Sequence, residues 1–163
     1  MIRRMSAKAA LLAAITLLAG CAQPTPPIVG AWRSKVQFED GAYASIRDLE
    51  FMLVYNAGGT MTESSNYDAA PPVPPAYGVW RESGKNTYTT RYEYYATQAS
   101  PTAQFGSGAG WLPAGHGVLT ETITLADDGQ SYRSTLRFEL FDAKGQPAEG
   151  GGTARVQAVR IGF

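Results

Sequence analysis

The chain of 163 residues contains one cysteine, Cys21, and one histidine, His116. A single cysteine excludes an intramolecular disulfide, so the fold must depend on its hydrophobic core. A single histidine with no second thiol also argues against a zinc site, because such sites draw on three or four ligands of these types. The chemistry that cysteine and histidine usually support is therefore scarce here.

Helical periodicity and long apolar runs are also missing. From residue 28 onward, apolar residues do not recur at the 3.6-residue spacing of an amphipathic helix, and the chain has 18 glycines and 10 prolines. Residues 9–19 form an apolar run of about eleven residues, whereas a membrane-spanning helix needs roughly 20. The sequence therefore predicts an all-β domain and no transmembrane helix.

What is present at the N-terminus has the three-part order of a secretory signal peptide. Arg3, Arg4 and Lys8 form a basic segment, the apolar run follows, and the small residues Ala19 and Gly20 end it. This order of charge, hydrophobicity and small residues is typical of an exported protein. We expect residues 1–20 to be a signal peptide.

The only cysteine directly follows this segment, in Leu18-Ala19-Gly20-Cys21. These four residues resemble the lipobox of bacterial lipoproteins. The resemblance implies that the Cys21 thiol receives a diacylglyceryl group, that a peptidase cuts before it, and that its new amino group is acylated, for example with palmitate. Cleavage that leaves a free thiol is the alternative. Several acyl chains would hold the protein on the membrane, because each buried methylene contributes about 0.8 kcal/mol.

The residue after the cysteine and the charge of the mature chain bear on location and partners. Ala22 stands where an inner-membrane retention signal would have Asp, so we expect the outer membrane if the host is Gram-negative. Without residues 1–20 the chain has 11 basic and 14 acidic residues, a net charge of −3. A slightly acidic domain lacks the positive surface that nucleic acids require, so we exclude them as partners.

Two parts of the chain follow the signal peptide. Residues 21–27 hold the cysteine and a short tether whose prolines keep it extended. Residues 28–163 are long enough for one domain with a real core. In this domain, segments of alternating apolar and polar residues are separated by turn signals such as Asp128-Gly129. We expect strands over residues 30–39, 46–55, 60–64, 77–82, 87–97, 118–125, 131–141 and 153–163.

Sequential hairpins of this kind favour a single antiparallel up-and-down β-barrel of about eight strands, because closure removes exposed strand edges. The proline-rich segment 69–76 and the glycine-rich segment 106–117 are expected to be loops at a rim of the barrel. The proline-rich loop is stiff and offers a docking strip for an envelope protein, although a rigid connection is the simpler interpretation.

The start of the first expected strand is Gly30-Ala31-Trp32. It is similar to the Gly-x-Trp signature of lipocalins and the wider calycin group. The resemblance implies a lipocalin-like barrel in which Trp32 packs at the closed end beneath an arginine of the last strand, for which Arg160 is in the right place. Two features depart from the family: no disulfide is possible, and the usual helix before the last strand is missing.

Aromatic residues supply the candidate binding site. Tyrosines recur on the apolar faces of the expected strands, and a ligand cavity is typically lined by such residues with a few polar groups. The alternative is that they fill the core of a small barrel, with their hydroxyls reaching its ends. The candidates are Tyr55, Tyr88, Tyr92, Tyr94 and Tyr132.

Catalytic and metal-binding patterns are not convincing. His116 is a candidate general base or metal ligand, but its glycine-rich surroundings favour a loop histidine at the start of a strand. Asp127-Asp128-Gly129 lacks the further spaced oxygen ligands of a calcium loop and reads as a hairpin turn. Among the acidic residues, nothing in the spacing brings Glu121 close to a second carboxylate. We therefore expect no enzyme, no metal and no cofactor.

The sequence thus predicts a lipid-anchored protein of the bacterial cell envelope whose barrel binds a small apolar or amphipathic ligand without catalysis. The alternative is a structural or protein-interaction module with a filled barrel. A third hypothesis is a cofactor-free enzyme that uses His116 or a tyrosine at the mouth of the barrel.

Overall fold

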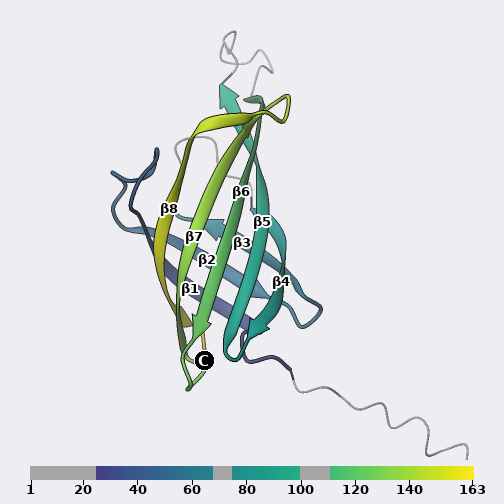
Figure 1. Cartoon of the computed structure of the whole chain (residues 1–163), viewed down its shortest axis with the longest axis vertical. Helices are drawn as coiled ribbons and strands as arrows, with labels where there is room; N and C mark the ends of the chain where they lie inside the picture. The colour runs from purple at the N-terminus through teal and green to yellow at the C-terminus, as the bar shows by residue number, and fades with distance from the viewer. Residues whose placement is uncertain (1–24, 68–74, 100–110) are drawn as a thin grey trace, which may run out of the picture.

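The computed structural model describes residues 25–67, 75–99 and 111–163, so Cys21 and the signal segment lie outside the described residues. Each strand pairs antiparallel with the next, and the last pairs with the first, which closes a single up-and-down barrel (Figure 1). The predicted fold class is confirmed. The strands are β1 (Gly30–Phe38), β2 (Leu49–Tyr55), β3 (Thr60–Ser65), β4 (Ala76–Gly84), β5 (Thr87–Ala99), β6 (Trp111–Leu125), β7 (Ser131–Asp142) and β8 (Pro147–Arg160).

Two glycine-rich segments are strands where the sequence predicted turns or loops. Residues 111–117 belong to β6, so His116 is paired within the sheet, and residues 147–152 belong to β8. Gly115 and Gly150 have positive φ angles of 128° and 109° and lie where the register shifts, as in β-bulges. Gly115 pairs with Ala96 of β5 and Asp142 of β7, whereas Gly150 lies between the paired residues Ala148 and Gly152. Both glycines thus stay within strands, although their side-chain pattern gives no strand signal.

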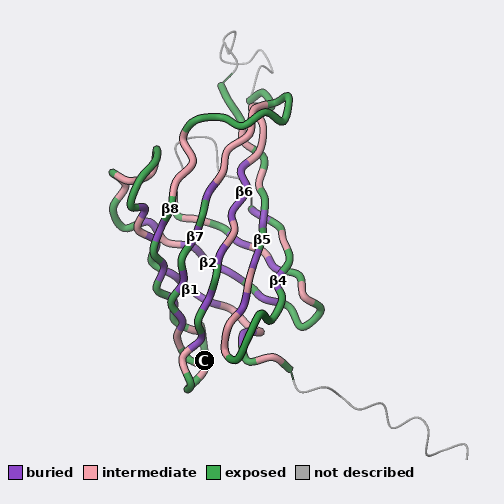
Figure 2. Tube along the Cα trace, viewed as in Figure 1, coloured by how far each residue is buried: buried purple, intermediate pink, exposed green. Residues whose placement is uncertain are grey.

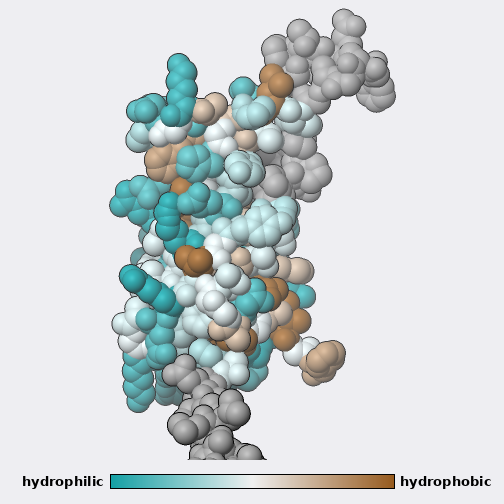
Figure 3. Space-filling view, turned by 90° about the vertical axis from the view of Figure 1, so that its right-hand side faces the viewer, coloured by the Kyte–Doolittle hydropathy of each residue, from teal (hydrophilic) through white to brown (hydrophobic). Residues whose placement is uncertain are grey.

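Burial alternates along β1, β2 and the adjoining stretches of the longer strands, and separates the inside of the barrel from the outside (Figure 2). In β1, for example, Trp32, Ser34 and Val36 are buried while Arg33 and Lys35 are exposed. The face seen in Figure 3 is accordingly mostly hydrophilic or neutral, with a few separate hydrophobic side chains. The apolar side chains of the strands therefore meet inside the barrel. In the part of the chain that the structure describes, no helix is long and apolar enough to cross a membrane.

One end of the barrel is closed by Trp32 and Arg160. The guanidinium carbon of Arg160 lies 4.3 Å from the centre of a Trp32 ring, and Trp32 Nε1 donates a hydrogen bond to the Ile28 carbonyl at 2.9 Å. Arg160 also donates to the carbonyl oxygens of Gly129 at 2.8 Å, Val29 at 2.9 Å and Pro27. The segment before β1 and the end of β8 are thus fastened together at this end.

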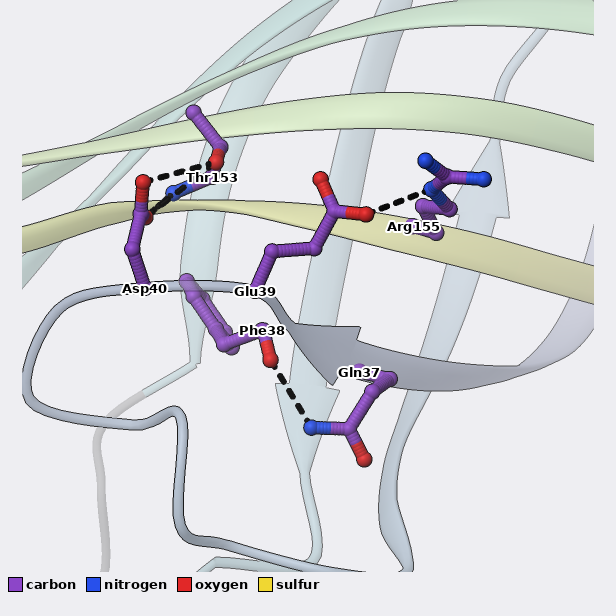
Figure 4. A network of polar contacts seen from close by, with 6 residues as sticks. All are labelled: Gln37, Phe38, Glu39, Asp40, Thr153 and Arg155. Carbon is purple, nitrogen blue, oxygen red and sulfur yellow. Dashed lines mark hydrogen bonds and ion pairs between the residues drawn. The ribbon is translucent and has the colours of Figure 1, made fainter.

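At the other end, side-chain bonds continue the seam between β1 and β8 beyond the last ladder pair (Figure 4). The Thr153 backbone N–H donates to Asp40 Oδ1 at 2.6 Å, and Arg155 Nε donates to Glu39 Oε1 at 2.6 Å. The Glu39 backbone N–H donates to the Thr153 carbonyl at 2.8 Å. These contacts fix the position of the connection that follows β1.

The two halves of the barrel differ in height. Strands β5 to β8 have 12 to 15 residues, whereas β1 to β4 have 6 to 9. Figure 1 shows the long strands rising beyond the short ones at the end opposite the C-terminus. The open end of the barrel is therefore bordered by the long strands β5 to β8 on one side and by the short strands β1 to β4 on the other.

Candidate functional site

A cavity of about 390 Å³ occupies the open half of the barrel. Its size falls within the range of about 300–1,000 Å³ that is typical of sites for small molecules. The residues that line it come from every strand except β4, and from the connections after β1 and β3. They are Phe38, Tyr43, Leu49, Phe51, Glu63, Ser65, Tyr67, Tyr94, Tyr95, Ala96, Thr97, Ala114, Leu119, Phe138, Leu140, Phe141, Asp142 and Ala148.

Eight of the eighteen residues that line the cavity are aromatic. The Tyr43 ring, in the connection after β1, contacts Phe38 and Phe138 with centroids 5.4 and 5.5 Å apart, and Tyr67 with centroids 5.7 Å apart. Tyr94 stacks on Phe138 with centroids 6.2 Å apart. Tilted and edge-on contacts of this kind hold the rings in place. The connection after β1 thus contributes a side chain to the site as well as joining two strands.

One buried carboxyl group lies in the apolar lining. Glu63 on β3 is 8% exposed, and among the described residues its Oε1 has no hydrogen-bond partner. Burial, together with the charge of Glu121, raises the pKa of Glu63 to about 8. At neutral pH the Glu63 carboxyl group is therefore mostly protonated. Glutamate is usually a surface residue, so the sequence alone would place Glu63 on the outside of the barrel.

Glu121 belongs to a second polar group that lies deeper in the barrel. Its carboxylate accepts hydrogen bonds from the hydroxyls of Ser134 and of Tyr92, the latter at 3.5 Å. Burial raises the pKa of Glu121 to about 7, and the two hydrogen bonds partly oppose this rise. Nearby, the hydroxyls of Tyr55 and Tyr132 lie 3.5 Å apart. This polar cluster satisfies groups inside the packed part of the barrel.

The five candidate tyrosines separate into two groups. Tyr94 lines the cavity, and burial with the neighbouring Tyr43 hydroxyl raises its pKa. The other four are at most 2% exposed and belong to the packed core, where burial raises the pKa of each. Trp80 adds to this packing, with edge-on contacts to Tyr55 and Tyr88 at 6.4 and 5.8 Å between centroids. One barrel thus contains both a filled half and a hollow half.

The sequence reasoning missed Glu63 and most of the aromatic lining. The signal that could have found Glu63 is its place in β3, where Met61 and Glu63 alternate with polar residues that face outward. Tyr43 and Tyr67 lie outside the strands, so no strand periodicity marks them. Phe38 and Phe138 lie on the inward faces of β1 and β7, but their meeting at the open end depends on the register of the whole barrel.

The charges of the lining have one sign. Among the described residues that line it, the only carboxylic acids are Glu63 and Asp142, and none is Lys, Arg or His. Asp142 Oδ1 accepts hydrogen bonds from the backbone N–H groups of Lys144 and Gln146, both at 2.8 Å, so it supports the turn after β7. Glu63 is therefore the acidic group that is free to meet a ligand.

The remaining sequence candidates lie elsewhere. The His116 ring stacks on Phe141 with centroids 4.9 Å apart and an interplanar angle of 8°. Asp128 belongs to the turn between β6 and β7, where its Oδ1 accepts a hydrogen bond from the Gln130 backbone N–H at 2.9 Å. Within residues 25–67, 75–99 and 111–163, no three His, Cys, Asp or Glu side chains are grouped so that they could hold a metal ion.

Comparisons with known proteins found no relative of this chain. It matches no protein-family model, no curated protein and no solved structure. What the barrel does must therefore be inferred from the cavity and the residues that line it.

Proposed function

We propose that the barrel binds one small, largely apolar molecule in the cavity at its open end, without catalysis. The observation that carries the proposal is the aromatic cavity of about 390 Å³ beside a fully packed core. A barrel of eight strands has room either for side chains alone or for one small ligand. The hollow half favours the ligand over the alternative of a filled interaction module.

The closed end supports a lipocalin-like form of this barrel. Trp32 lies beneath Arg160 of the last strand, which is the arrangement that the Gly30-Ala31-Trp32 resemblance implies. The guanidinium holds the segment before β1 over the end of the core. A ligand would accordingly enter from the opposite end.

Titration of the purified full-length protein with the neutral fluorescent probe N-phenyl-1-naphthylamine tests the binding proposal. We expect a fluorescence increase that saturates at one probe per chain. Ala96→Trp places a large ring among the cavity-lining residues and should weaken binding at least tenfold. Thr89→Trp, on the outer face of the same strand, is the matched control. Equal affinity for the Ala96→Trp and Thr89→Trp proteins would show that the probe binds elsewhere.

We further propose that Cys21 is lipidated and anchors the protein in the bacterial envelope, at the outer membrane if the host is Gram-negative. The support is the Leu18–Cys21 pattern after a basic and then apolar segment. Cys21→Ser should abolish incorporation of labelled palmitate and release the protein from the membrane fraction. Labelled, membrane-bound Cys21→Ser protein would refute the anchor.

A further inference from the structure

We infer that the ligand of the cavity is an organic amine: an apolar body that carries a protonated ammonium group, held by Glu63. This inference rests on the proposed function and names the chemical class of the ligand. Glu63 lines the cavity, more than nine-tenths of its surface is buried, and no described residue offers a hydrogen bond to its Oε1. A buried polar atom of this kind costs stability unless something pairs with it.

An ammonium group is the partner that suits this atom. An N–H of the ligand would donate to the Glu63 carboxylate in a charge-assisted hydrogen bond, which is stronger than a bond between neutral groups. Because the described lining contains no Lys, Arg or His, no cation among the lining residues 38–148 that the structure describes competes for the carboxylate. An anionic ligand would instead meet two acids and no base, so the charge of the cavity selects against it.

The walls suit the rest of such a molecule. Phe38, Tyr43, Tyr94 and Phe138 contact one another in a chain of rings around the cavity. Aromatic faces attract cations as well as apolar groups, because the faces carry negative charge density. The aromatic lining therefore favours both the apolar body of an organic amine and the carbon atoms next to its ammonium group.

The acidic groups around Glu63 also favour a cationic ligand over an anionic one. The pairing partners of Glu63 in β2 and β4 are Leu53 and Ala76, which carry no charge. The titratable groups that face it or share its cavity are Glu121 of β6, Tyr92, Tyr94 and Tyr95 of β5, Asp142 of β7, and Tyr43 and Tyr67 of the connections. All of these are acids, so a bound cation is attracted by each one that ionises.

Three probes with one apolar body and different head groups test the inference: 2-phenylethylamine, 2-phenylethanol and 3-phenylpropanoate. Isothermal titration calorimetry on the full-length protein at pH 8 should show the amine binding at least tenfold more tightly than the alcohol, and the carboxylate most weakly. Glu63→Gln should weaken amine binding at least tenfold and leave the alcohol within a factor of two. Glu93→Gln, on the outer face of β5 with its side chain 48% exposed, is the matched control.

A pH series on the unmodified protein gives a second readout that does not depend on how Glu63→Gln folds. Because burial raises the pKa of Glu63 to about 8, the amine should bind on the order of 50-fold more tightly at pH 8 than at pH 6. The alcohol should bind equally at both. An amine affinity that does not change with pH would overturn the inference.

The outcomes separate the inference from the proposed function. If N-phenyl-1-naphthylamine binds but the amine binds no better than the alcohol, the amine inference is overturned and the proposed function stands. If none of the four compounds binds, the proposed function is overturned as well.

Discussion

Replacing Glu63 by Gln tests the buried carboxyl group through the pH dependence of folding. Burial and the charge of Glu121 raise the pKa of Glu63 from its ordinary value of 4.5 to about 8. Above pH 4.5 the unfolded chain releases this proton while the folded protein keeps it. The free energy of unfolding therefore falls as the pH rises from 4.5 towards 8, and the stabilising contribution is complete only below that window.

The size of the effect follows from the two pKa values. For a single site with these values, the free energy of unfolding falls by about 3 kcal/mol between pH 5 and pH 8. For a domain of this length, that loss corresponds to a decrease in Tm on the order of 10 °C. Glutamine resembles the protonated acid and cannot ionise, so Glu63→Gln should be about 3 kcal/mol more stable than the unmodified protein at pH 8 and similar at pH 5.

Thermal and urea unfolding of the full-length protein, followed by circular dichroism at half-unit pH steps from 5 to 8, would measure this difference. Burial raises the pKa of Glu121 to about 7. In the Glu63→Gln variant the free energy of unfolding should therefore still fall as the pH rises, but by less than in the unmodified protein. Glu93→Gln, an exposed change of the same charge, should run parallel to the unmodified protein. Parallel curves for Glu63→Gln and the unmodified protein would refute the buried, unpaired environment assigned to Glu63.

Four further substitutions test the packing by urea unfolding. Thr90→Val should raise the free energy of unfolding by about 1 kcal/mol, because the Thr90 hydroxyl is buried without a described partner; a loss of stability would contradict this. Arg160→Ala should cost about 2–4 kcal/mol through its contact with Trp32 and its carbonyl partners, and a cost below 1 kcal/mol would argue against the end closure. Gly115→Ala should cost at least about 2 kcal/mol, because φ is 128° and the added methyl would lie 1.9 Å from a backbone oxygen. Gly129→Ala, with positive φ but open space, should cost only about 1 kcal/mol, and equal costs would refute the steric reason.

The sequence predicts the barrel better than it predicts the cavity, for a physical reason. Alternation in segments such as 30–38 is enforced by the sheet itself, because successive side chains point to opposite faces. The bulged ends of β6 and β8 escaped prediction because backbone pairing on either side of the bulges, rather than side-chain pattern, keeps these segments in strands. The order of apolar and polar residues within one segment does not show which backbone groups of another strand will pair with it.

The site depends on long-range register, which local pattern does not specify. Tyr88 and Tyr94 have the same alternation along β5, yet Tyr88 lies in the packed end and Tyr94 lines the cavity. Which half of the barrel is hollow follows from side chains contributed by seven strands and two connections. An apolar face could therefore be assigned from the sequence, but the empty volume in front of it could not.

The segment before β1 and the end of β8 are both held at the closed end of the barrel. This arrangement determines which end of the barrel a lipid anchor at Cys21 would keep near the membrane. Only about six residues separate Cys21 from Ile28, which span at most roughly 25 Å when extended. With Cys21 lipidated as proposed, the Trp32–Arg160 end would therefore stay near the bilayer and the cavity would open on the far side. Such a protein would collect its ligand from the aqueous space rather than from the lipid beneath it.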